Sequence, residues 1–279
     1  MSHVARGTRA STLALATAIC CLGLAAACTT TTVTSSSGAV ISSTTSGGPA
    51  ATSQANAKAR ARARVDLAAG YFRNGQMSVA LEEAKRAVQI DPTLADAYGL
   101  LGLIYTELDD RREAEANFQR ALQLEPANPD INNNYGWVLC RNGREQEAMG
   151  YFQRALRDPL YATPSLANLN AGMCMMRAKD YAAAEPYLRR AFELDASSPA
   201  AKVELTRLYL ATGQTERAAF YYGLLSRTTD ETAESLWLGL KLARAQGDLR
   251  TETRRASELR SRFPSSKEAS LLARGAFDE

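Results

Sequence analysis

Small and apolar residues recur along this chain at a fixed interval, with charged residues between them. One set consists of Ala80, Ala114 and Ala148, which follow one another at steps of 34 residues, and other small residues repeat with the same period. In the second interval, Ala114, Phe118 and Ala121 are four and three positions apart, the spacing of one face of a helix. The pattern predicts an all-α chain of helical hairpins, with small residues where the two helices of a hairpin cross.

The intervals predict six hairpin units followed by a short capping segment. The units cover 61–94, 95–128, 129–162, 165–198, 199–232 and 233–266, and the cap covers 267–279. The array resembles tetratricopeptide repeats, most clearly in the second unit through Tyr98, Leu101, Gly102, Tyr105, Ala114, Phe118, Ala121 and Pro126. The resemblance implies a superhelix of stacked units, because one hairpin cannot bury its apolar face alone. The sixth unit is weaker, since Glu252 stands where a small residue is expected.

The N-terminal residues are typical of an export signal. Arg6 and Arg9 precede an apolar run at 12–27 that ends in small residues. A membrane anchor is the alternative, but a span needs ~20 apolar residues and this run is shorter. We therefore expect residues 1–27 to be removed as a signal peptide.

The segment LAAAC, which ends at Cys28, resembles the lipobox of bacterial lipoproteins, although Ala25 stands where that motif prefers leucine. The resemblance implies that Cys28 is acylated. Because Thr29 follows instead of aspartate, it also implies sorting to the outer membrane, with the protein facing the periplasm. The Ser/Thr/Gly-rich composition after Cys28 predicts a flexible tether over 28–60. A secreted protein without lipid is the alternative.

Charge and composition restrict the chemistry that the mature chain can perform. The chain has 33 Lys+Arg and 30 Asp+Glu, and two of the arginines leave with the signal, so the mature net charge is +1. This balance gives no indication of a nucleic-acid partner. The only histidine, His3, also leaves with the signal, so histidine-activated nucleophiles and histidine metal ligands are excluded. We predict no catalytic residue, cofactor, metal site or small-molecule substrate.

In tetratricopeptide arrays the first helix of each unit lines a concave groove, which we expect to bind a partner protein. An exposed apolar patch from Trp137 to Met176 would mark that site, since methionine adapts to irregular apolar ligands. The alternative is that these side chains pack between units and meet no partner. The predicted groove residues are Asn133, Trp137, Leu166, Leu169, Met173, Met176, Arg177 and Arg207.

Two cysteines, Cys140 and Cys174, remain in the mature chain besides Cys28. They lie on the first helices of adjacent units, so their Cα atoms can come within the ~4.4–6.8 Å that a disulfide requires. An exported protein meets an oxidising compartment. We predict a structural disulfide that contributes ~3–4 kcal/mol, with two reduced buried thiols as the alternative. Two cysteines are too few for a metal site, and the chain lacks a histidine base for a nucleophile.

The join between the third and fourth units is more specific than a repeat consensus. Segments 133–156, 158–174 and 187–210 resemble the type IV pilus biogenesis and stability lipoprotein family, called PilF or PilW. The resemblance covers about residues 61–266, and the long tether and weak sixth unit depart from it. It implies a pilotin that binds the type IV pilus secretin subunit and promotes its outer-membrane localisation and multimerisation. Pilus biogenesis and twitching motility would depend on that step.

The predicted parts fit this role. Acyl chains on Cys28, palmitate among them, would bind outer-membrane lipid. We hypothesise that the groove of the first four units holds a segment of the secretin. Another envelope lipoprotein scaffold, serving cell-wall or polysaccharide-export machinery, is the alternative function. An enzyme is disfavoured, because the repeats leave no room for a catalytic domain.

Overall fold

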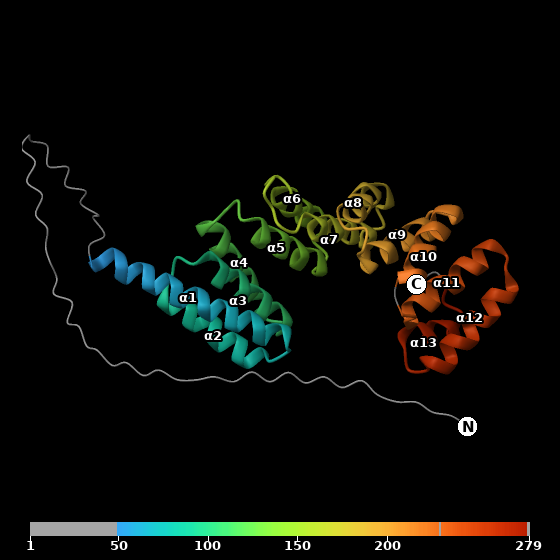
Figure 1. The fold of residues 1–279 in the computed structure, drawn as a ribbon, viewed down its shortest axis with the longest axis horizontal. Coiled ribbons are helices and arrows are strands. Elements are labelled where there is room, and N and C mark those ends of the chain that lie inside the picture. The colour runs from blue at the N-terminus through green and yellow to red at the C-terminus, as the bar shows by residue number, and fades with distance from the viewer. Residues whose placement is uncertain (1–48, 229, 278–279) are drawn as a thin grey trace, which may run out of the picture. The chain divides into compact units, whose positions relative to one another are not determined.

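The computed structural model describes residues 49–228 and 230–277, and this part of the chain forms thirteen α-helices (Figure 1). The predicted signal peptide and Cys28 lie outside the described residues. The helices are α1 (Pro49–Arg73), α2 (Met77–Ile90), α3 (Ala95–Glu107), α4 (Arg111–Leu124), α5 (Pro129–Arg141), α6 (Glu145–Ala155), α7 (Pro164–Arg177), α8 (Tyr181–Leu194), α9 (Pro199–Ala211), α10 (Thr215–Thr228), α11 (Ala233–Gln246), α12 (Leu249–Arg262) and α13 (Lys267–Arg274).

Helices α1–α12 form six hairpins, and the expected all-α tetratricopeptide-repeat superhelix is confirmed. Each hairpin turn holds one residue in the left-handed region of backbone space, and glycine occupies four of these six turns. The other two turns use Asp109 and Lys179, with φ of 57° and 58°. Glycine adopts this conformation without the steric cost that a Cβ brings.

Small residues lie where the two helices of a hairpin cross. A Cβ built on Gly102 would lie 2.6 Å from the ring of Phe118, and one on Gly172 would lie 2.5 Å from Leu188. Phe118 and Leu188 are fully buried. The first helix can therefore approach the second closely enough to cover these large side chains only because its crossing position has no side chain.

The first helices of the hairpins lie side by side in one row. α1 contacts α3, α3 contacts α5, and the series continues through α7 and α9 to α11. In the described part of the chain, each second helix contacts only its hairpin partner and the helix that follows it. Because the first helices contact one another and the described second helices do not, the row of first helices lines the inner side of the superhelix.

The first helix corrects the predicted end of the tether. The tether was expected to run to residue 60, but α1 begins at Pro49. The segment from 55 to 64 is rich in alanine and arginine, both of which favour helix strongly, and the core begins only at Ala61, which is fully buried. Among the described helices, none is both long enough and apolar enough to cross a membrane.

The C-terminal helix α13 covers the end of the array. It contacts α11 and α12, and its Leu271 and Leu272 pack with Leu236 and Leu259 in a cluster of their own. Ser266 caps the helix by accepting a hydrogen bond from the backbone N–H of Ala269 at 3.0 Å. The expected capping segment is therefore a helix that shields the last hairpin from solvent.

Candidate functional site

The predicted groove residues of the fourth unit form a stripe along α7. Leu166, Leu169, Met173 and Met176 are three or four residues apart, so they share one face of the helix. Leu166 is 46% exposed, and the other three side chains are half-buried. We call these four residues the α7 stripe. It presents apolar surface to solvent on the inner side of the array.

The apolar patch packs between units and also leaves part of its surface exposed. Trp137 of α5, Leu169 and Met176 pack against the central core, and all three remain only half-buried. They therefore contribute to the contacts between units and still leave area that a partner can cover. Such partly covered apolar surface is a common feature of protein-binding faces.

Asn133 has a different role from the one predicted. It is 2% exposed, and its side-chain oxygen accepts a hydrogen bond from Nδ2 of Asn170 at 3.0 Å. The amide therefore links α5 to α7 and is unavailable to the backbone of a bound peptide. A buried amide needs a partner, and the neighbouring unit supplies it.

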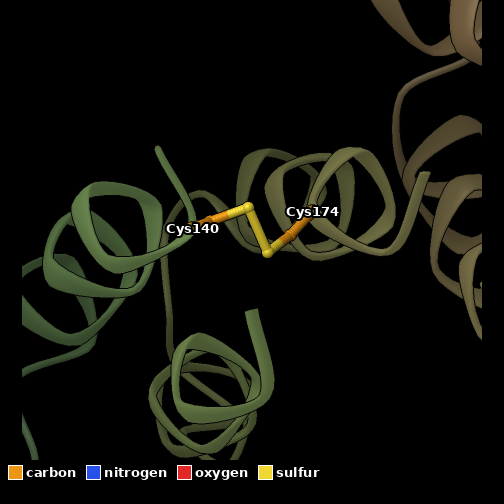
Figure 2. Close-up of a disulfide and its surroundings, with 2 residues drawn as sticks. All are labelled: Cys140 and Cys174. Atoms are coloured by element: carbon orange, nitrogen blue, oxygen red, sulfur yellow. A yellow bond between two sulfur atoms is a disulfide. The ribbon is translucent and has the colours of Figure 1, made fainter. Parts of the chain in front are cut away.

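The cysteines form a second link between the same two helices. Figure 2 shows the side chains of Cys140 and Cys174 meeting between α5 and α7, joined by the sulfur–sulfur bond. Their Cα atoms are 5.7 Å apart, within the range that a disulfide requires. The predicted disulfide is thus present in the structure, and both residues are fully buried. It fixes the α7 stripe relative to Trp137.

Ion pairs tie other first helices together. Arg141 of α5 donates to Glu107 of α3 at 2.6 Å. Arg207 of α9 pairs with Glu204 at 2.8 Å on its own helix and also with Glu234 of α11. Burial raises the pKa of Glu204, and the charge of Arg207 opposes that shift. Arg207, predicted as a partner-binding residue, therefore holds α9 to α11 while its side chain stays 43% exposed.

Arg177 is the last residue of α7 and lies at the exposed edge of the stripe. Its position allows contact with a partner, and a cation at a helix C-terminus also interacts favourably with the helix dipole. The predicted residues thus divide into two groups. The α7 stripe, Trp137 and Arg177 offer surface, whereas Asn133 and Arg207 mainly hold the surface in place.

A cavity of about 550 Å³ lies at the end of the row, between the last three hairpins and α13. Met176 and Arg207 line it together with Trp237, Leu271 and Phe277. The rings of Trp237 and Phe277 are stacked, with centroids 5.3 Å apart. Residues 267–279 were expected only to cap the array, and nothing in the sequence indicated that α13 and Phe277 would also line this cavity.

The chemistry of the face is that of a binding surface. No group of three or more potential metal-ligating side chains occurs among the residues that the structure describes. The inner face combines apolar side chains with exposed arginines on a frame held by a disulfide and ion pairs. A surface of this kind suits an extended or helical segment of another protein.

Comparison with known proteins agrees with the geometry. Tetratricopeptide-repeat family models match residues 100–164 and 175–242. The type IV pilus assembly protein PilF of Pseudomonas aeruginosa is 29% identical over 206 residues, which make up 74% of this chain and 82% of PilF.

Solved structures give the same result. The crystal structure of PilW, a widely conserved type IV pilus biogenesis factor, has a TM-score of 0.71 and 34% identity, and the match covers 76% of this chain and 98% of PilW. The structure of P. aeruginosa PilF has a TM-score of 0.70 and 26% identity, with 80% of this chain and 99% of that chain covered.

The hairpin array and its inner face define a tetratricopeptide-repeat scaffold. Within that class, the sequence identity to PilW and PilF and the share of those chains that is matched identify a narrower group. The chain belongs to the type IV pilus biogenesis family of PilF and PilW.

Proposed function

We propose that this protein is a pilotin, which binds the secretin subunit of the type IV pilus machinery and promotes its multimerisation in the outer membrane. The α7 stripe is the observation that supports this proposal. It places apolar area on the inner face, next to Trp137, in a family that serves type IV pilus biogenesis. The secretin segment would lie along this face as a helix or strand.

The rigidity of the face supports the same function. The disulfide and the Asn170–Asn133 hydrogen bond hold α5 and α7 together. A surface that is ordered before binding loses less conformational entropy when the partner arrives. The stripe is thus prepared to bind one segment of the client without rearranging the hairpins.

We further propose that acyl chains on Cys28 hold the protein in the outer membrane, facing the periplasm. The support is the lipobox-like sequence before Cys28 and the absence of aspartate after it. A Cys28→Ser variant should lose palmitate labelling and leave the outer-membrane fraction. Palmitate incorporation that persists in this variant would contradict the proposed anchor.

The binding site is tested by charge substitution on the stripe. Cells that produce the Leu169→Glu, Met173→Glu variant should lose secretin multimers on immunoblots, while the amount of the lipoprotein itself stays unchanged. Leu166→Glu is the companion variant, because that side chain is already 46% exposed and its replacement should not disturb folding.

A matched control inserts the same charges elsewhere. Leu160 and Leu249 are 89% and 74% exposed and lie outside the stripe, so a Leu160→Glu, Leu249→Glu variant should keep normal multimers. Wild-type multimer levels in the stripe variants would refute the proposed site. Equal losses in stripe and control variants would refute it as well.

A further inference from the structure

Helix α1 is much longer than the helix with which it pairs, and the additional length is basic. It has 25 residues, whereas α2 has 14. Residues 53–60 lie before the first buried position and are exposed, apart from half-buried Ala57. Packing therefore does not explain this extension, and its side chains face solvent.

The solvent face of α1 has a defined pattern. Ala59, Ala63 and Leu67 recur at intervals of four residues and are all exposed, with Leu67 43% exposed. At 100° per residue, Arg60 and Arg62 lie on opposite sides of this apolar line. We call this surface the α1 face. Exposed basic side chains on both sides of the line are attracted to an anionic surface.

An open hollow adjoins one edge of the α1 face. It measures about 500 Å³, and its lining combines two guanidinium groups with apolar side chains: Arg60, Ala63, Arg64, Leu67 and Ile90. The hollow lies on the first hairpin, where no preceding hairpin is present in the described part of the chain. The apolar surface that a neighbouring unit covers elsewhere is therefore left open here.

The charges of α1 are only partly compensated by nearby carboxylates. Arg64 pairs with Glu83 of α2 at 2.5 Å, and Asp91 lies close enough to Lys58 and Arg62 to interact with both charges.

Within the described residues, however, Lys58, Arg60 and Arg62 form no ion pair. Asp66 is the only carboxylate on α1 itself. Three cations within five residues thus remain available to an anionic partner.

Positive charge is concentrated in this part of the molecule. Residues 49–94 carry seven basic and four acidic residues, a net charge of +3. Residues 95–279 carry 24 basic and 26 acidic residues, a net charge of −2. The array is therefore polarised, and its basic end is the end that follows the proposed lipid anchor in sequence.

We infer that the α1 face binds an anionic phospholipid surface. Charge complementarity favours this partner, and so does the position of α1 in the sequence, because only 20 residues lie between Cys28 and Pro49. An acyl anchor on Cys28 would therefore keep α1 near the membrane. The inference extends the proposed anchoring, but the binding of α1 to lipid does not require the acyl chains.

The contact would add electrostatic attraction to the attachment that the proposed acyl chains on Cys28 provide. Each basic side chain near an anionic surface increases binding about fivefold, so Lys58, Arg60 and Arg62 together would increase it about a hundredfold at low salt. The contact would also set the orientation of the array, with α1 at the membrane and the later hairpins reaching into the periplasm.

The test uses the exported chain with Cys28→Ser, so that lipidation cannot contribute. Vesicles of phosphatidylethanolamine and phosphatidylglycerol at 3:1 should sediment this protein in 50 mM salt, and phosphatidylcholine vesicles should not. Binding should fall as the salt concentration rises, because salt screens exposed charges. Arg60→Glu with Arg62→Glu should weaken binding to the anionic vesicles at least tenfold.

The matched control reverses two exposed arginines on other hairpins, Arg112→Glu with Arg157→Glu, and should change binding less than twofold. Circular dichroism verifies that each variant is folded. If Arg60→Glu with Arg62→Glu disturbs folding, the neutral variant Arg60→Gln with Arg62→Gln is used in its place. The inference is overturned if anionic vesicles do not sediment the protein, if neutral vesicles sediment it equally, or if both double variants lose binding to the same extent. Failure here would leave the secretin assay and palmitate labelling unaffected.

Discussion

Replacing Gly172 with alanine should destabilise the array, although the same change at Gly150 should stabilise it. Both glycines lie inside helices, α7 and α6 respectively. Alanine is favoured over glycine in a helix interior by ~1 kcal/mol, so helix propensity alone predicts a gain at both sites. At Gly172, however, the surrounding side chains reverse the sign of the expected change in stability.

The structure gives the magnitude of the difference. A Cβ at position 172 would lie 2.5 Å from Cδ2, 2.6 Å from Cγ and 3.2 Å from the backbone nitrogen of Leu188, whereas a Cβ at position 150 would meet no atom within 4 Å. Leu188 is fully buried, so the two helices must separate. Overpacking of this kind costs ~2–3 kcal/mol, which leaves a net loss of ~1–2 kcal/mol after the gain in propensity.

Thermal unfolding of residues 47–279, followed by circular dichroism, measures both effects. Gly172→Ala should lower Tm by about 2–8 °C and Gly150→Ala should raise it by about 2–4 °C, at the 2–4 °C per kcal/mol expected for a domain of this size. In a Leu188→Ala background the loss should disappear, because the clashing atoms are gone. An increase in Tm for Gly172→Ala, or a loss that persists beside Ala at 188, would refute the close-crossing argument.

Two further predictions concern the links between units. Replacing Cys140 and Cys174 with alanine should remove about 3–4 kcal/mol of stability, because the disulfide closes a long loop; hydrogen exchange should increase in α5–α8 and stay unchanged in α1–α2, and uniform protection would contradict this. The hydrogen bonds that Glu115 accepts from Arg144 and Tyr135 lower the pKa of this glutamate, so its stabilising contribution is present above its unfolded pKa of about 4.3 and is lost as the pH falls through the lowered value. The side chains of Arg144 and Glu115 are each 40% exposed, so Glu115→Gln should lower the free energy of unfolding by only ~0.2–1 kcal/mol at pH 7. The difference in Tm between this variant and wild type should shrink toward pH 3. A difference that stays constant with pH would contradict the role assigned to Glu115.

The repeat period was readable from the sequence because it reflects local packing inside each hairpin. Gly102 and Gly172 stand where a side chain would collide with the partner helix, and Ala114 is buried at the second crossing position. The disulfide was predictable for the same reason, since Cys140 and Cys174 occupy nearby positions on adjacent first helices. Each of these features depends on residues within about one repeat.

The start of α1 was less predictable. Composition marks the Ser/Thr-rich stretch as unable to form a core, but it does not show where helix propensity takes over. The alanine- and arginine-rich residues before Ala61 form helix without a core to bury. The tether was expected to end at residue 60 because its composition cannot form a core, but the helix begins at Pro49, twelve residues earlier than that boundary implies.

The sequence by itself determined the number of hairpins, their order and the residues that face each neighbour. Only the tertiary structure decided what each inner-face side chain does. Asn133 accepts a hydrogen bond from Asn170 of the next unit, and the ring of Phe277 stacks on the ring of Trp237. The physical reason is range. Helix period and crossing positions depend on side chains a few residues apart, whereas exposure on the inner face depends on the angles at which separate hairpins pack, and many distant contacts set those angles together.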